Sequence, residues 1–213
     1  ATNQGTLTNM NTGLNNCTGN CSGWSNGIIG NGIAFDGVND FVDAGFNNSI
    51  NISNNLSISM WIKLNSILGN QMFLAKSVNY NFRVASGKLS FLTTFADGTS
   101  NVTLSSVSLS TNVWYYVVAI YSNYYSTLYI NGNNTTYTTR FNSSGKLLKQ
   151  TNEHLFFGKR DDPIYFNGSL DEVRIYNRAL SAEEIAILYN TSLKTTGNTT
   201  FSNNTASSGY IHS

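Results

Sequence analysis

The chain has 213 residues, of which only 11% are Asp, Glu, Lys or Arg, and its formal net charge is +1. This length is sufficient for one sizeable hydrophobic core. The low and balanced charge argues against a nucleic-acid-binding protein, which would carry a basic patch. No apolar run approaches the roughly 18 residues of a membrane-spanning helix. The sequence also shows no signal peptide, so we expect Ala1 to begin a mature or excised chain.

Residues 1–32 are rich in Gly and Asn and poor in apolar side chains, which predicts an irregular arm before the first strand. Cys17 and Cys21 lie in this arm. Zinc would need four soft ligands, and two cysteines with two distant histidines do not supply them. A local disulfide between the two cysteines is therefore predicted, and it favours an oxidising compartment.

Short segments with apolar and polar residues in alternation follow from residue 32 onward. The clearest is 56–64 (LSISMWIKL), in which every second residue from Leu56 is apolar and Trp61 lies on the other side. Residues 114–121 (WYYVVAIY) are apolar on both sides, which predicts a central strand. Further strands are expected at 71–77, 80–85, 88–95, 101–109, 126–130, 135–141 and 154–158, with Asn or Gly between most of them. Many short strands of this kind predict an all-β sandwich.

The segment 168–190 closes the pattern with one more strand and a short helix. Alternation over 169–176 places Asp171 on the same side as Val173 and Ile175. A carboxylate on the core side of a strand is costly unless it is paired. We therefore expect Asp171 to lie at a solvated strand end, to hold a cation or to cap a neighbouring loop.

A capping box predicts where the helix begins. Ser181 and Glu184 have the spacing at which the serine hydroxyl and the glutamate carboxylate satisfy each other's backbone N–H groups. The stripe that should pack on the sandwich consists of Ala182, Ile185, Leu188 and Tyr189.

Composition divides the chain into a domain, 1–190, and a tail, 191–213, that is rich in Ser, Thr and Asn. Such a tail should be disordered when alone. The alternation around Thr200–Ser202 and Tyr210–Ile211 would allow strand addition, which makes further copies of this chain candidate partners through the terminal segments.

The sequence contains thirteen Asn-x-Ser/Thr triplets, about twice the number that composition explains. This excess predicts a secreted, N-glycosylated protein of the cell surface. The acceptor residues are Asn16, Asn20, Asn47, Asn51, Asn55, Asn101, Asn133, Asn134, Asn142, Asn167, Asn190, Asn198 and Asn203.

Several segments, taken in order, resemble laminin-G-like domains of the concanavalin-A-like lectin/glucanase superfamily. The resemblance covers roughly residues 5–190, and its most specific part is GSLDEVRIYNRALSAEEI (168–185). It implies a jelly roll of two antiparallel sheets with the helix packed at the side. The chain departs from the family pattern at Tyr115 and Tyr116, where relatives often have His, and at Asn131, where they often have Asp. The other matching segments are GTLTNM (5–10), GWSNGIIGNGIAFDG (23–37), FDGVNDFVDAG (35–45), LSISMWIKL (56–64), NVWYYVVAIYS (112–122), STLYINGN (126–133) and LFFGKRDD (155–162).

The resemblance also implies a structural Ca²⁺ between the turn after the first strand and the last strand. Carried over to this chain, the ligands would be Asp171 and either Asp36 or the carbonyl groups of its neighbours, all hard oxygen atoms that suit Ca²⁺. The alternative is that Asp171 only accepts backbone hydrogen bonds and that Asp36, Asp40 and Asp43 form turns.

Glucanases of the superfamily carry their catalytic carboxylates on one strand as Glu-x-Asp-x-x-Glu, and this chain lacks that arrangement. Its four glutamates are Glu153, Glu172, Glu183 and Glu184. We therefore expect no enzymatic activity. The predicted function is a non-catalytic structural or adhesive subunit of a cell-surface coat or filament. The alternative is a carbohydrate-binding module of a secreted protein, with cell-surface glycans as partners.

Glycan binding would require aromatic side chains that present a ring face beside polar groups. The candidates are Trp61, Tyr80, Tyr124, Tyr125 and Tyr165. The alternative is that these rings fill the core of the sandwich.

Overall fold

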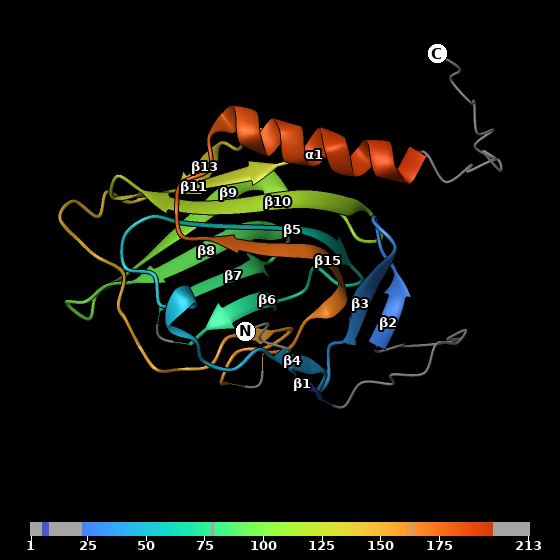
Figure 1. The fold of residues 1–213 in the computed structure, drawn as a ribbon, viewed down its shortest axis with the longest axis horizontal. Helices are drawn as coiled ribbons and strands as arrows, with labels where there is room; N and C mark the ends of the chain where they lie inside the picture. The colour runs from blue at the N-terminus through green and yellow to red at the C-terminus, as the bar shows by residue number, and fades with distance from the viewer. Residues whose placement is uncertain (1–5, 9–22, 78, 163, 198–213) are drawn as a thin grey trace, which may run out of the picture.

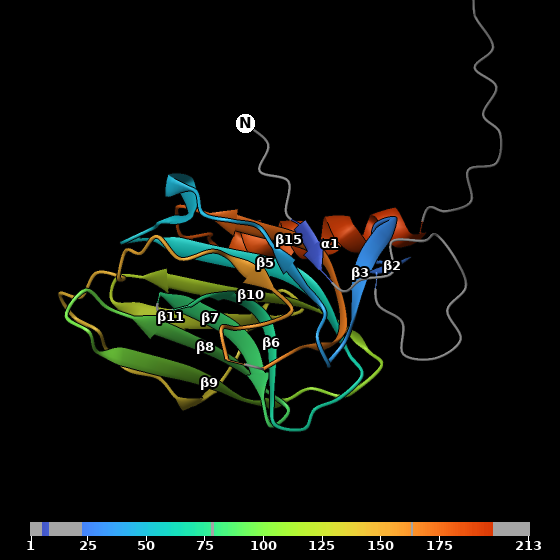
Figure 2. The same ribbon diagram turned by 90° about the horizontal axis from the view of Figure 1, so that it is seen from below.

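The computed structural model describes residues 6–8, 23–77, 79–162 and 164–197, and within them the chain forms two antiparallel sheets that pack face to face (Figures 1 and 2). This confirms the predicted all-β jelly-roll sandwich with a C-terminal helix. Cys17 and Cys21 lie outside the described residues, as do residues 198–213 of the predicted tail.

In the described part of the chain, the first sheet has eight strands. Their spatial order is β1 (Thr6–Thr8), β4 (Phe41–Asp43), β14 (Phe156–Phe157), β6 (Asn70–Lys76), β7 (Tyr80–Ala85), β8 (Lys88–Thr94), β9 (Ser100–Ser108) and β13 (Tyr137–Thr139). The second sheet has seven described strands in the order β12 (Asn133–Asn134), β11 (Tyr125–Ile130), β10 (Trp114–Ser122), β5 (Leu56–Leu64), β15 (Asn167–Tyr176), β3 (Asn31–Asp36) and β2 (Gly23–Asn26). A 3₁₀ turn, η1 (Asn48–Ile50), precedes β5.

Two boundaries differ from the sequence-based expectation. The segment 1–32, predicted to be irregular, contains the strands β1 and β2, because its backbone pairs with β4 and β3 rather than because its side chains alternate. The helix α1 (Ala182–Gly197) continues past residue 190 into the segment assigned to the tail. There the hydroxyl of Ser192 donates to the carbonyl of Leu188 at 2.7 Å, as in a helix interior.

The core between the sheets follows the alternation of β5 and β10. In β5 the side chains of every second residue from Leu56 to Leu64 are fully buried between the sheets, while Trp61 faces the other side. β10 lies inside its sheet, between β11 and β5, which confirms the predicted central position. It is buried on both faces: Val117 packs between the sheets and Val118 packs under the helix. Burial of each such aliphatic side chain contributes about 1.5–3 kcal/mol.

The helix α1 covers the outer face of the second sheet (Figure 2). Ile185 is fully buried, and the ring of Tyr189 lies 5.7 Å from that of Trp61. The predicted stripe is thus confirmed at Ile185, Leu188 and Tyr189, but Ala182 is exposed.

The predicted capping box is present at the start of this helix. The N–H of Glu184 donates to the Ser181 hydroxyl at 3.2 Å, and the N–H of Ser181 donates to the Glu184 carboxylate at 2.9 Å. The guanidinium of Arg178 also binds this carboxylate and, together with the Ser181 N–H, lowers the pKa of Glu184 to about 2.

Tyr121 of β10 gives the fold a predictable response to alkaline pH. Its side chain is 1% exposed, its hydroxyl donates to the carbonyl of Lys146 at 2.7 Å, and burial raises its pKa to about 12. In the unfolded chain a tyrosine loses its proton near pH 10. Between pH 10 and pH 12 the folded state therefore binds more protons than the unfolded state, and the free energy of unfolding falls as pH rises.

We therefore expect the variant Tyr121→Phe to lose stability less steeply than the wild type between pH 10 and pH 12. At pH 7, where neither state ionises, the variant should lose only the hydrogen bond, about 1 kcal/mol. Urea unfolding at pH 7, 10 and 11 measures both quantities. Equal slopes for the two proteins above pH 10 would contradict this role of Tyr121.

Candidate functional site

Asp171 accepts three backbone N–H groups from two segments near one edge of the second sheet. Its Oδ2 accepts the N–H groups of Ile28 at 2.6 Å and Ile29 at 2.9 Å, and its Oδ1 accepts the N–H of Glu172 at 2.7 Å. The residue is 6% exposed. Of the three roles considered for this carboxylate, capping of a neighbouring loop is the one that these hydrogen bonds show.

The loop that Asp171 caps is the tight connection between β2 and β3. Gly27 donates its N–H to the carbonyl of Gly30 at 3.0 Å. A Cβ atom on Gly27 would lie 2.4 Å from Asp171 Oδ2, so only glycine allows the loop to approach the carboxylate this closely. Asp171 therefore adds a buried side-chain anchor for the β2–β3 loop to the backbone pairing that joins β3 to β15.

A β-bulge in β15 decides which way Asp171 faces. The pairing of β15 with β5 shifts between Asp171 and Arg174, and Glu172 adopts a φ of +50°. The extra residue resets the alternation, so Leu170 and Val173 both pack between the sheets. Asp171 pairs with Trp61, whose ring lies on the helix side. The prediction that Asp171 shares a side with Val173 and Ile175 is therefore wrong.

Asp36, the other predicted calcium ligand, lies in a separate turn. Its Oδ1 accepts the N–H of Val38 at 2.7 Å. Asp36 pairs with Asn167 across β3 and β15, four positions from Asp171, which corresponds to about 13 Å along the strand. The two carboxylates are therefore not brought together.

This arrangement does not fit a calcium ion shared by Asp36 and Asp171. Both oxygens of Asp171 already face N–H donors, which a cation would have to displace. Among the described residues, no group of three or more His, Cys, Asp or Glu side chains could hold a metal ion. Calcium binding by either aspartate alone stays a prediction.

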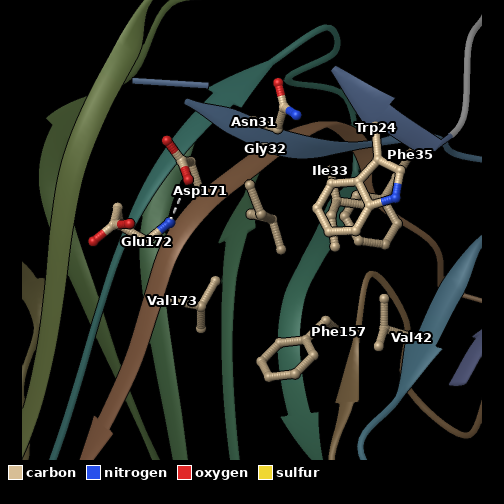
Figure 3. Close-up of a pocket in the computed structure, with 11 residues that line it drawn as sticks. Trp24, Asn31, Gly32, Ile33, Phe35, Val42, Phe157, Asp171, Glu172 and Val173 are labelled. Carbon is tan, nitrogen blue, oxygen red and sulfur yellow. Dashed lines mark hydrogen bonds between the residues drawn. The ribbon is translucent and has the colours of Figure 1, made fainter. Parts of the chain in front are cut away.

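A mainly apolar pocket of about 280 Å³ lies between β2, β3 and β15 of the second sheet and β4 and β14 of the first (Figure 3). Trp24, Ile33 and Leu170 occupy neighbouring positions across β2, β3 and β15 and form one side of it. Val42 and Phe157 face them from the other sheet. Asn31, Asp171 and Glu172 line the polar part, and the remaining lining residues are Gly32, Phe35 and Val173.

Trp24 lies at the mouth of this pocket. Its side chain is 48% exposed although the ring lies beside Ile33 and Phe35 in Figure 3. It is exposed because β2 is the last described strand of its sheet, so no further strand covers the ring. The sequence analysis did not select Trp24 as a site residue. The signal available was a single large aromatic residue in a Gly- and Asn-rich stretch.

The aromatic candidates chosen from the sequence divide into two groups. Trp61 and Tyr80 are buried in the two apolar clusters, which makes them core residues and not ligand platforms. Tyr124 and Tyr125 are 41% and 37% exposed at the turn between β10 and β11. Tyr165 is half-buried in the connection between β14 and β15.

A family model described as the concanavalin A-like lectin/glucanases superfamily matches residues 36–186. The chain belongs to this superfamily. The match includes β15 with its bulge and the first turn of α1, which contain the motif that suggested the resemblance. A comparison with curated proteins found no match.

Solved structures with the same fold include binding domains of larger proteins. The binding domain of Paraclostridial Mosquitocidal Protein 1 superposes with a TM-score of 0.67 at 21% identity, over 80% of this chain and 45% of that one. The receptor binding domain of botulinum neurotoxin D gives 0.60 at 22% identity, over 79% and 46%. This superfamily member therefore spans less than half the length of those toxin domains.

Domain 4 of AbnA, an extracellular arabinanase from Geobacillus stearothermophilus, matches over nearly its whole length. Its TM-score is 0.66 at 20% identity, over 87% of each chain, and that structure was solved in complex with arabinotriose.

In the described part of the present chain, no helix is long and apolar enough to cross a membrane.

The role of Asp171 predicts the effect of removing its charge. The variant Asp171→Asn places an amide group, itself a donor, among three N–H donors. We expect the free energy of unfolding to fall by about 2–4 kcal/mol. The control Asp36→Asn changes a carboxylate in an exposed turn and should cost less than about 1 kcal/mol. Urea unfolding of both variants measures the difference, and equal losses would refute the assigned role.

Proposed function

We propose that this superfamily member is a non-catalytic carbohydrate-binding domain of an extracellular protein, and that the Trp24 pocket is its binding site. The observation that carries the proposal is the half-exposed Trp24 ring beside an apolar pocket that has polar groups in one part. The complex of a domain of the same fold with arabinotriose supports a sugar as ligand, although the site itself is argued from the residues of this chain.

Sugars have the amphipathic chemistry that such a pocket can bind. The C–H face of a sugar ring packs on an aromatic ring, while its hydroxyl groups need hydrogen-bonding partners. Trp24 would offer the ring, and the amide of Asn31 would offer a donor and an acceptor. The volume lies near the lower limit of small-molecule sites, roughly 300 Å³, which favours one or two sugar units.

The state of the carboxylates in the pocket supports binding without catalysis. A glycosidase needs one carboxyl group that gives a proton and a second one that acts as base or nucleophile. Asp171 accepts three backbone N–H groups, and Glu172 forms an ion pair with Arg174. Neither carboxylate is therefore available for the two roles.

The exposure of the glycosylation triplets supports an extracellular glycoprotein. Nine of the acceptor residues lie in the described part of the chain. Five of these are exposed, namely Asn47, Asn133, Asn134, Asn142 and Asn190. A cell-surface location stays a prediction. Assembly of a coat or filament through the terminal segments also stays a prediction, because most residues of those segments lie outside the described structure.

Replacement of Trp24 tests the proposed site. We expect Trp24→Ala to weaken binding of the preferred glycan by at least about tenfold, since truncation of an aromatic anchor costs over about 1.4 kcal/mol of binding free energy. Trp24→Phe keeps a ring and should bind with intermediate affinity. A glycan array identifies the ligand, and calorimetry with that ligand gives the affinities.

The control for this experiment is Leu68→Ala, which removes an apolar side chain that is 79% exposed on a different loop. It should bind like the wild type. Unchanged binding by Trp24→Ala, with the fold intact by circular dichroism, would exclude this pocket as the glycan site.

The side-chain contacts of the acceptor residues predict which triplets carry sugar. The amide nitrogen of Asn101, the atom that would be glycosylated, donates to the hydroxyl of buried Ser143 at 2.7 Å. Asn142 and Asn190 are exposed. We expect glycans at Asn142 and Asn190 and none at Asn101, and glycopeptide mass spectrometry of the protein from an N-glycosylating host measures the occupancy. A sugar on Asn101 in folded protein would contradict this expectation.

A further inference from the structure

Five arginines lie in the described part of the chain, and Arg140 is the exposed one without an ion pair, since Arg83, which also has none, is half-buried. Arg160, Arg174 and Arg178 each form an ion pair with a carboxylate. Arg140 is exposed and forms no ion pair with any described residue. Its positive charge is therefore not compensated locally by a carboxylate of the described chain.

The guanidinium of Arg140 is nevertheless held in one place. Its Cζ atom lies 4.9 Å from the ring centroid of Tyr125 and 4.9 Å from that of Tyr137, so two aromatic rings lie within cation–π distance of the charge. Its Nε donates to the carbonyl of Ser126 at 2.9 Å, and its Nη2 donates to the hydroxyl of Thr127 at 2.9 Å. These contacts fix a side chain that is usually mobile at a surface.

One of the two rings is itself fixed by hydrogen bonds. The hydroxyl of Tyr137 accepts the N–H of Leu128 at 3.0 Å and donates to the side chain of Asn134 at 2.7 Å. Tyr137 belongs to β13 of the first sheet, and Leu128 belongs to β11 of the second. The aromatic frame around Arg140 is thus built from both sheets at the edge where β11 and β13 lie.

Two of the five N–H donors of the guanidinium are used in these contacts, which leaves three for a ligand. A planar fork of this kind matches a carboxylate, which it binds through two parallel hydrogen bonds. Two exposed rings lie near Arg140. Tyr125 contacts the guanidinium, and Phe141, the next residue in the chain, is 48% exposed. Such rings can pack against the C–H face of a sugar.

We propose that Arg140, framed by Tyr125 and Tyr137, forms a second saccharide site, specific for sugars that carry a carboxylate. This site lies at the β11 and β13 edge of the sandwich, opposite the β2 edge where Trp24 lies (Figure 1). It does not depend on the Trp24 pocket, and the two sites can be tested separately. A sulfated sugar presents a related anion, but its tetrahedral geometry matches the planar fork less well.

The test compares an acid with its neutral ester on the full chain. The probes are trigalacturonic acid, an oligosaccharide ending in N-acetylneuraminic acid, the methyl esters of both, and a sulfated galactose oligosaccharide. We expect at least one acid to bind at least about tenfold more tightly than its ester, and more tightly than the sulfated probe. Affinity should fall as NaCl rises from 50 to 500 mM because the site is exposed to solvent.

Variants test whether Arg140 causes the preference for acidic sugars. Arg140→Gln should lose the preference for the acid, and Arg140→Lys should retain only part of it, since a lysine lacks the planar fork. Arg178→Gln removes the same charge from an arginine paired with Glu184 and should bind like the wild type. Trp24→Ala should also retain acid binding, which separates this site from the pocket.

Two results would overturn the proposal. One is that neither acid binds the wild-type chain more tightly than its ester, a comparison that does not depend on whether any variant folds. The other is that Arg140→Gln, with an unchanged melting temperature, keeps the preference for the acid. Arg140 would then only join the two sheets.

Discussion

The arrangement of the β2 edge depends on the three backbone hydrogen bonds that Asp171 accepts. A buried carboxylate is costly unless donors surround it, and here the donors come from the β2–β3 loop and from the bulge in its own strand. Because these donors are backbone N–H groups, the bonds fix the course of the chain and not merely a side chain. The hairpin that presents Trp24 is thereby held against β15, and the apolar pocket opens beneath it.

The bulge at Glu172 connects this local arrangement to the rest of the sandwich. Without the extra residue, strict alternation could not place both Leu170 and Val173 in the core, because residues three positions apart in a regular strand face opposite sides of the sheet. With it, Leu170 and Val173 complete the core between the sheets, and Asp171 faces the side on which the helix packs. The left-handed φ of Glu172 is the local conformational cost of satisfying both requirements.

The two proposed saccharide sites use opposite edges of the same sandwich. At the β2 edge an apolar pocket opens between the sheets, and at the β11 and β13 edge rings from both sheets hold one arginine. The edges differ in charge as well as in shape. The lining of the pocket is mainly apolar, whereas Arg140 carries a charge that has no carboxylate partner among the described residues. A neutral sugar at the first site and an acidic sugar at the second follow from this difference.

The sequence by itself determined the all-β class, the central position of β10 and the capping box at Ser181, because each depends on residues close together in the chain. It also selected Asp171 as an unusual residue but placed it on the wrong side, since no local pattern announced the bulge. Only the tertiary structure decided that Trp61 is buried while Trp24 is exposed, and that Arg140 lies between two tyrosines. Those outcomes depend on which strands end a sheet and which distant segments meet there, and the spacing of residues along the chain does not encode either.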